Sequence, residues 1–107
     1  MRWYKIAESM AELRQVMGSP CQVKVAGREL CIAIAPNQQA YACAAKCPHA
    51  GGLMAQGWVD PLGNIVCPLH RYKFSLKNGN NTSGEGYFLK TYPVKEDEDG
   101  LWVGLTP

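Results

Sequence analysis

The sequence predicts an all-β protein built from short antiparallel strands, with at most one short helix near the N-terminus. Segments rich in β-branched, aromatic and other apolar residues follow one another, and polar bends containing Gly, Pro or Asn separate them. Only one stretch carries a helix-capping pattern. A chain of 107 residues can bury an ordinary core, so we expect a single domain over residues 1–107.

The N-terminal segment is predicted to be a strand followed by a helix. Residues 3–7 are rich in aromatic and β-branched side chains, as strands are. Ser9 and Glu12 fit a capping box, which predicts a short helix or single turn through about Arg14 that ends before residues 18–20. Its apolar residues recur at spacings of three and four, and we expect them to pack in the core: Met10, Leu13 and Met17.

Three short strands are predicted next, over residues 21–25, 29–35 and 40–44. Gly27 lies in the first bend between them, where a turn can require a positive φ. Strands in such a row form an antiparallel meander. Three cysteines lie here among apolar neighbours, and we expect buried free thiols rather than a disulfide: Cys21, Cys31 and Cys43.

The C-terminal half is predicted to contain two hairpins. The first comprises residues 58–66 with a turn at 60–64, and a strand over residues 72–76 follows it. The polar, glycine-rich segment 77–86 is predicted to be a loop without chemistry of its own. The second hairpin pairs residues 92–95 with 101–105, and the acidic run between them fits a solvated turn better than a metal site.

Two short segments hold the residues with the clearest chemistry. The first is Cys47-Pro48-His49, the second is Cys67-Pro68-Leu69-His70, and seventeen residues lie between His49 and Cys67. These histidines are the only two in the chain. Two thiolates and two imidazoles can bind one tetrahedral zinc, or a two-iron, two-sulfide cluster with both cysteines on one iron and both histidines on the other. The alternating order Cys, His, Cys, His favours the cluster, because Cys2His2 zinc sites usually present a cysteine pair and then a histidine pair.

This motif resembles that of the Rieske iron-sulfur proteins. The resemblance extends to residues 50–53 after the first segment, to residues 72–76 and 78–79 after the second, and to residues 91–94. It implies the Rieske fold, an antiparallel β-sandwich with an inserted cluster-binding lobe over about residues 44–77. It also implies one [2Fe-2S] cluster per chain, with Cys47 and Cys67 on the inner iron. His49 and His70 would bind the outer iron through their δ nitrogens.

The function implied by the resemblance is that of a Rieske ferredoxin, a one-electron carrier rather than an enzyme. Its partners would be a flavin-dependent reductase and a terminal oxygenase or similar acceptor. Asp60 is the only carboxylate in residues 44–77, so a mononuclear iron site with two histidines and one carboxylate cannot be assembled there. The alternatives are the small Rieske subunit of an assimilatory nitrite reductase and a zinc-stabilised interaction module.

Charge and hydropathy narrow the expected partners. The sequence contains no uncharged apolar run long enough to predict a membrane span, and the N-terminus lacks an apolar signal region. We therefore expect a cytoplasmic protein, and we expect it to be a monomer. Residues 44–77 contain four basic residues and one acidic residue, a net charge of +3: Lys46, Arg71, Lys73 and Lys77 against Asp60. The patch is too small, and too poor in interleaved aromatic residues, for nucleic-acid binding. It could steer acidic partners, or these could be ordinary solvated side chains.

Differences between this chain and other Rieske proteins bear on the reduction potential. High-potential members of the family have a disulfide between the loops and a serine hydroxyl directed at a sulfide; Gly52 and Leu69 stand in place of those cysteines, and no matching serine is present near Lys73. The sequence therefore predicts a low-potential cluster. Many relatives have glycine after the second histidine, where this chain has Arg71.

Overall fold

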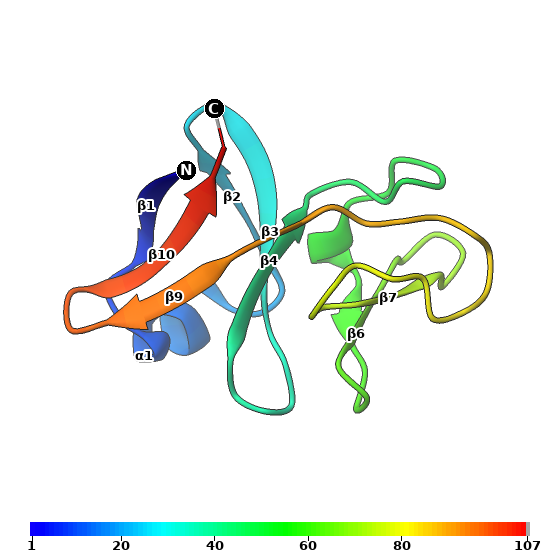
Figure 1. Cartoon of the computed structure of the whole chain (residues 1–107). Coiled ribbons are helices and arrows are strands. Elements are labelled where there is room, and N and C mark those ends of the chain that lie inside the picture. The colour runs from blue at the N-terminus through cyan, green and yellow to red at the C-terminus, as the bar shows by residue number, and fades with distance from the viewer. Residues whose placement is uncertain (107) are drawn as a thin grey trace.

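The computed structural model describes residues 1–106, and this part of the chain contains three antiparallel sheets (Figure 1). The first sheet has the order β1-β10-β9, with β1 Arg2–Ala7, β10 Gly100–Leu105 and β9 Val94–Asp97. The second has the order β2-β3-β4-β8, with β2 Cys21–Val25, β3 Arg28–Ile34, β4 Ala40–Ala44 and β8 Thr91–Tyr92. The third has the order β5-β6-β7, with β5 Trp58–Val59, β6 Asn64–Val66 and β7 Lys73–Ser75. The predicted all-β class is confirmed.

The predicted helix is present and longer than expected. It begins as α1, Met10–Glu12, and continues with wider turns as η1, Leu13–Met17. The Ser9 hydroxyl accepts a hydrogen bond from the Glu12 N–H, as the capping pattern predicts, and the Glu12 carboxylate accepts one from the N–H of Glu8. The helix passes Arg14 because the N–H of Gly18 donates to the carbonyl of Leu13, five residues back. Leu13 is fully buried, and Met10 and Met17 pack against the same core, as predicted.

The predicted meander is β2, β3 and β4. Val25 pairs with Arg28, so the turn between β2 and β3 has only two residues, Ala26 and Gly27, and β3 begins one residue earlier than predicted. Both turn residues have positive φ, 51° and 81°, as expected for a tight hairpin whose turn matches the twist of the strands.

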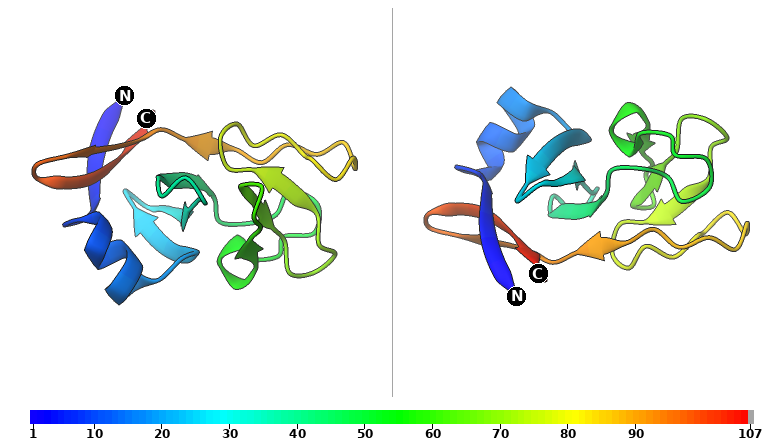
Figure 2. Two further views of the ribbon diagram at one scale, coloured as in Figure 1. Left: turned by 90° about the horizontal axis from the view of Figure 1, so that it is seen from below. Right: turned by 90° about the horizontal axis from the view of Figure 1, so that it is seen from above.

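The last part of the chain differs from the prediction at Pro93. Residues 92–95 were expected to form one strand, but β8 ends at Tyr92 in the second sheet and β9 begins at Val94 in the first. Proline has no N–H to donate to a neighbouring strand, so the chain changes sheets at this residue. The hairpin of β9 and β10 then brings the C-terminal strand against β1, and the two ends of the chain lie side by side (Figures 1 and 2).

Two buried clusters hold the layers together. One lies between the first two sheets and the helix and contains Leu13, Leu30, Ile32, Leu101 and Val103. The other joins the second sheet to the third, and its largest members are Met54, Ile65, Phe74, Leu76 and Leu89. The third sheet and its loops therefore project to one side of the other two sheets (Figures 1 and 2).

The cysteines of the meander differ in burial. Cys31 and Cys43 are fully buried free thiols opposite each other on β3 and β4, as predicted. Cys21 is a free thiol but only half-buried, so the expected burial is wrong for this residue. It lies on β2, at the edge of its sheet. Within residues 1–106 no helix has the length and apolar character needed to cross a membrane.

Candidate metal centre

The first loop of the motif begins where the chain leaves β4 for the third sheet. The N–H of Cys47 donates to the carbonyl of Gly52 at 2.7 Å, and the N–H of Gly51 donates to the carbonyl of Cys47 at 2.9 Å. Gly51 has a φ of 71°, in the left-handed region that glycine adopts without a steric cost. This short loop places His49 at its tip.

The second loop, between β6 and β7, repeats this hydrogen-bond pattern. The N–H of Cys67 donates to the carbonyl of Tyr72 at 2.9 Å, and the N–H of Arg71 donates to the carbonyl of Cys67 at 3.0 Å. Arg71 is therefore the counterpart of Gly51, and its φ of 61° is also left-handed. A non-glycine residue in this conformation costs about 1–2 kcal/mol, so the second loop contains a strained residue that the first does not.

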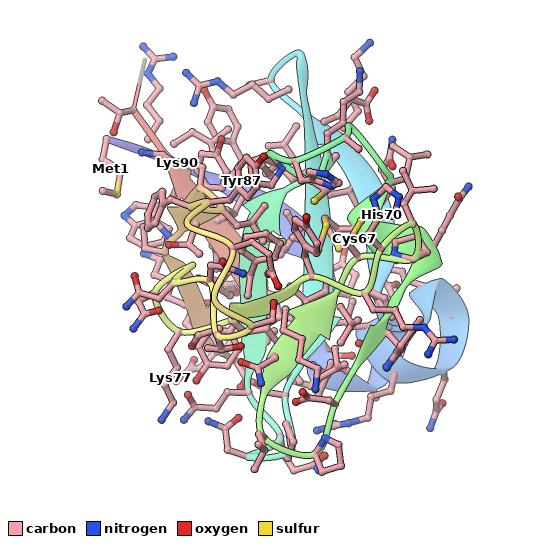
Figure 3. All side chains as sticks on the ribbon, turned by 90° about the vertical axis from the view of Figure 1, so that its right-hand side faces the viewer. Met1, Cys67, His70, Lys77, Tyr87 and Lys90 are labelled. Carbon is pink, nitrogen blue, oxygen red and sulfur yellow. The ribbon has the colours of Figure 1, made fainter. Side chains whose placement is uncertain are left out.

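The two imidazoles converge between the loops. The δ nitrogens of His49 and His70 lie 3.3 Å apart, and the ring centroids lie 4.8 Å apart with an angle of 65° between the planes. His70 is exposed and His49 is half-buried. Figure 3 shows His70 at the surface, with Cys67 on its inner side.

The two thiols are a second pair, buried behind the imidazoles. Cys47 is 2% exposed and Cys67 is fully buried. Burial raises the pKa of Cys47, and so does its contact with the Cys67 thiol, whereas the N–H groups of His49 and Ala50 point at its sulfur and oppose that rise. Backbone N–H groups directed at a sulfur favour its thiolate, the form that binds metals.

The donor set fits a two-metal cluster better than a single ion. The sulfurs of Cys47 and Cys67 form one group and the δ nitrogens of His49 and His70 form another. A tetrahedral zinc needs all four donors around one point, whereas a [2Fe-2S] cluster of this type takes two cysteines on one iron and two histidines on the other.

Aromatic side chains cover one of the two imidazoles. The ring centroid of Tyr72 lies 4.2 Å from that of His49, and the centroid of Tyr87 lies 5.4 Å from it. Tyr72 is farther from His70, at 6.2 Å. Burial, with the negative charge of Glu85 next, raises the pKa of Tyr72. Tyr87 comes from the segment between β7 and β8, one residue beyond the loop predicted over residues 77–86, and no role was predicted for it.

Asn81 fixes the conformation of that segment. Its side-chain oxygen accepts hydrogen bonds from the N–H groups of Glu85 and Gly86, and its amide donates to the carbonyl of Lys73 and to the carboxylate of Glu85. Ser83 accepts from the N–H of Lys73 and donates to Glu85. The sequence gives one signal of this role, an aromatic pair at residues 87–88 that ends an otherwise polar loop.

Gly52 and Leu69 bring the two loops into contact. A Cβ atom on Gly52 would lie 2.9 Å from Cγ of Leu69 and 3.1 Å from Sγ of Cys67. The positions occupied by cysteines in high-potential relatives thus adjoin one another in this chain, without sulfur at either.

The expected basic patch around the imidazoles is smaller than the sequence suggests. Lys73 Nζ lies 3.8 Å from a carboxylate oxygen of Asp60, which is 9% exposed. Lys77 lies well away from Cys67 and His70 (Figure 3). Arg71 is the basic residue that adjoins a histidine, and none of its side-chain atoms forms a hydrogen bond or ion pair with residues 1–106.

Asp60 has a structural role in the turn between β5 and β6. Its carboxylate accepts hydrogen bonds from the N–H groups of Leu62 and Asn64 and from the Asn64 amide. Burial alone would raise the pKa of Asp60, but these hydrogen bonds and the charge of Lys73 lower it below its ordinary value. The carboxylate oxygens of Asp60 are therefore already engaged by hydrogen bonds and by the ion pair with Lys73.

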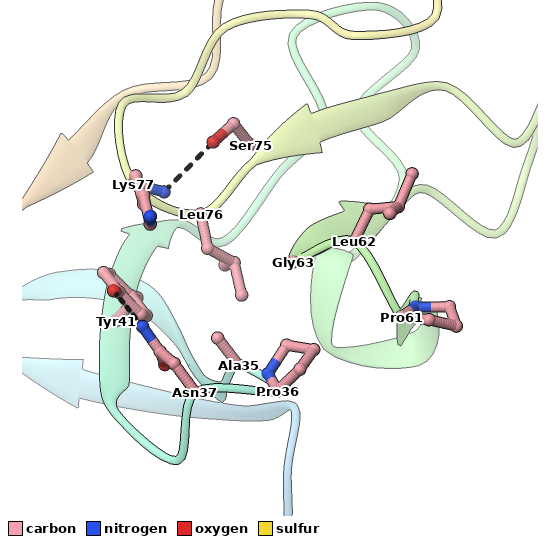
Figure 4. Close-up of a pocket in the computed structure, with 10 residues that line it drawn as sticks. All are labelled: Ala35, Pro36, Asn37, Tyr41, Pro61, Leu62, Gly63, Ser75, Leu76 and Lys77. Atoms are coloured by element: carbon pink, nitrogen blue, oxygen red, sulfur yellow. Dashed lines mark hydrogen bonds between the residues drawn. The ribbon is translucent and has the colours of Figure 1, made fainter.

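A cavity of about 260 Å³ lies elsewhere, between the β3–β4 turn and the β5–β6 turn (Figure 4). Its lining includes Pro36, Tyr41, Leu62 and Lys77 and none of the four residues of the motif. It is separate from the candidate metal centre.

Comparison with known proteins identifies the family. The family model described as Rieske [2Fe-2S] domain matches residues 2–93. A cholesterol 7-desaturase from Bombyx mori is 27% identical over 107 residues, which cover 94% of this chain and 23% of that protein. The ferredoxin subunit of a 3-phenylpropionate/cinnamic acid dioxygenase from Escherichia coli (strain K12) is 30% identical over 66 residues, which cover 61% of this chain and 62% of that protein. The chain thus spans less than two thirds of the length of either relative.

Two solved structures share the fold over nearly the whole chain. The ferredoxin of carbazole 1,9a-dioxygenase from Nocardioides aromaticivorans has a TM-score of 0.84 at 23% identity, covering 99% of this chain and 100% of that one. A protein described as a putative NADH-dependent nitrite reductase small subunit from Mycobacterium tuberculosis has a TM-score of 0.83 at 19% identity, covering 99% and 96%.

Proposed function

Because the chain belongs to the Rieske [2Fe-2S] domain family, we propose that it is a one-electron carrier whose cluster is bound by Cys47, His49, Cys67 and His70. The observation that carries this proposal is the convergence of the two imidazole δ nitrogens, 3.3 Å apart, at the outer end of two loops with the same hydrogen bonding. When bound, a [2Fe-2S] cluster takes up and releases one electron at a time.

The two thiols and the two imidazoles differ in burial, and we assign them different roles. The buried thiols of Cys47 and Cys67 keep the inner side of the centre away from water, and the N–H groups directed at Cys47 stabilise its thiolate. The imidazoles of His49 and His70 lie on the outer side, where an electron can leave. This division matches the inner and outer irons that the family resemblance implies.

The proposed role is transfer without substrate chemistry. Asp60, the one carboxylate in residues 44–77, is engaged by Leu62, Asn64 and Lys73. The relatives named as ferredoxin components of a dioxygenase and of an alkene monooxygenase system are electron-transfer components. We therefore infer that the partners are a flavin-dependent reductase and a terminal oxygenase, in the cytoplasm, with the chain acting as a monomeric domain. A solved complex of oxygenase and ferredoxin in carbazole 1,9a-dioxygenase supports a partner of that class.

A low reduction potential is part of the proposal. The Rieske range extends from roughly −150 to +300 mV and follows hydrogen bonding and exposure. Gly52 and Leu69 supply no interloop disulfide, and His70 is exposed. We expect a midpoint below zero millivolts at neutral pH.

Metal analysis with point variants tests the ligand assignment. The purified protein should contain about two irons and two acid-labile sulfides per chain and show a reduced-state EPR signal. Cys47→Ser and His70→Ala should each lose that signal, whereas Cys21→Ser, a control on β2, should keep it. Colourless protein with one zinc per chain would refute the proposal.

The small subunit of a nitrite reductase is the second candidate function, because solved chains so described share the fold. Electron delivery to a purified oxygenase, or to a nitrite reductase, separates the two.

A further inference from the structure

The two imidazoles of the centre have different surroundings. His70 is exposed, whereas His49 is half-buried and has the rings of Tyr72 and Tyr87 packed against it. Both tyrosine rings lie within 5.4 Å of His49 by centroid distance, and they also lie 5.9 Å from each other. Together they form a cover over one imidazole and leave the other open.

The cover is held in place by the segment that carries it. Asn81 ties the N–H groups of Glu85 and Gly86, immediately before Tyr87, to the carbonyl of Lys73 on β7. These bonds fix the backbone immediately before Tyr87 and so the position from which its ring reaches His49.

Two residues of opposite charge, Glu85 and Arg71, lie near different imidazoles. Glu85 lies on the His49 side, close enough for the two to interact electrostatically, and hydrogen bonds from Ser83 and Asn81 lower its pKa and keep it ionised. Arg71 lies next to His70 and is exposed, and its guanidinium has no hydrogen bond or ion pair with residues 1–106. Glu85 therefore disfavours an acidic surface at His49, and Arg71 favours one at His70.

The backbone conformation of Arg71 also supports a functional role for its side chain. Arg71 holds a left-handed φ of 61°, which its counterpart Gly51 adopts freely. A strained residue that persists beside a functional group suggests a functional use of its side chain. Leu69, on the other side of His70 in the sequence, is 54% exposed and supplies an apolar contact.

Resting on the electron-carrier function above, we propose that His70 alone is presented to partner proteins, with Leu69 and Arg71 as the contact around it, while Tyr72 and Tyr87 exclude His49. The surface fits a partner with an apolar patch beside a carboxylate. With a cluster held by the four motif residues, one electron would pass from the reduced protein to the oxidised partner, and no covalent bond would form or break.

Chemical labelling tests the exposure directly, because the chain has only two histidines. The holoprotein is treated with diethyl pyrocarbonate, and the modification of each histidine is followed by peptide mass spectrometry. His70 should react several-fold faster than His49, and Tyr87→Ala should remove most of that difference. Phe88→Ala, at a neighbouring residue that is 57% exposed and makes none of the ring contacts with His49, is the matched control and should leave it unchanged. Equal reactivity in the unmodified protein would overturn the proposal.

Electron transfer to small charged oxidants tests the contact surface. The reduced holoprotein is mixed with ferricyanide, an anion that stands for an acidic partner, or with the cobalt(III) tris-phenanthroline cation. Arg71→Glu should slow ferricyanide on the order of tenfold at low ionic strength and accelerate the cation. Ala50→Glu places one negative charge next to His49. Because Arg71→Glu changes the charge by two units and Ala50→Glu by one, the effects are compared per unit of charge, and that of Ala50→Glu should be much the smaller for both oxidants. An equal or larger effect of Ala50→Glu per unit of charge would refute the assignment. If the carrier function itself were wrong, no variant would be reversibly reduced, and the labelling result would still decide which imidazole is open.

Discussion

Arg71 and Gly51 allow a paired test of the loop geometry. They occupy equivalent positions in the two loops, each donating its N–H to the carbonyl of a motif cysteine, at 3.0 and 2.9 Å. Both are left-handed, with φ of 61° and 71°. The substitutions Arg71→Gly and Gly51→Ala therefore change the same feature in opposite directions.

The expected magnitudes follow from the backbone alone. A left-handed φ costs a non-glycine residue about 1–2 kcal/mol, and glycine loses about 0.5–1 kcal/mol more through its greater freedom in the unfolded chain. Arg71→Gly should therefore stabilise the fold by about 0.5–1 kcal/mol. A Cβ at Gly51 meets no atom within 4 Å, so Gly51→Ala adds no clash and should destabilise by a similar amount.

The rate of cluster loss in denaturant measures this difference on the holoprotein. A change of about 0.5–1 kcal/mol corresponds to about a two- to fivefold change in rate, slower for Arg71→Gly and faster for Gly51→Ala. Arg71→Gly should at the same time slow electron transfer to ferricyanide, because it removes the charge beside His70. If Arg71→Gly lost its cluster faster than the wild type, the guanidinium would be stabilising the loop, and the argument from strain would be wrong.

Three further predictions concern the surroundings of the centre. A disulfide introduced by Gly52→Cys with Leu69→Cys should join the loops and stabilise the protein by about 3 kcal/mol, seen as slower cluster loss that reductant reverses; two free thiols at these positions after oxidation would contradict it. Asp60→Asn should lower the apparent Tm at pH 7 through a loss of about 1–2 kcal/mol of hydrogen bonding. Because the pKa of Asp60 is lowered in the folded state, its contribution is present above about pH 4 and is lost as the pH falls through the folded value, so the Tm difference from the wild type should shrink in acid. Lys77→Glu should leave the rate with ferricyanide within about twofold, since Lys77 lies away from His70. A loss as large as that of Arg71→Glu would instead support steering by all the basic residues of segment 44–77.

The sequence predicts those features that depend on local chemistry. The meander, the capping box at Ser9 and the two hairpins each depend on nearby residues, and the structure contains them. The pairing of β1 with β10 joins the two ends of the chain, and no local pattern specifies it. The sequence shows that Pro93 lacks a backbone N–H donor, which can break a strand. It does not show that the chain changes sheets there, because that depends on which strands lie on either side.

The site shows the same limit. Spacing and residue type are enough to predict the four motif residues. The cover over His49 could not be predicted in this way, because it depends on Tyr87, seventeen residues beyond His70, and on Asn81, which fixes the loop before it. The position of the charges in space also depends on contacts that the sequence pattern does not specify. Lys73 and Lys77 count toward the lobe in the sequence, yet one pairs with Asp60 and the other lies away from His70.

The asymmetry of the imidazoles has a source in the sequence itself. The two loops have the same hydrogen bonds, but His49 is the second residue after its cysteine and His70 is the third after its own. By position Ala50 is the counterpart of His70, and Leu69 is the counterpart of His49. Two equal loops with their histidines displaced by one residue cannot present both rings alike. One ring lies under the tyrosines, and the other stands beside the left-handed residue that closes its loop. The exposed ring and the strained arginine are therefore neighbours because of one residue of spacing, and a partner that binds Arg71 is brought to His70.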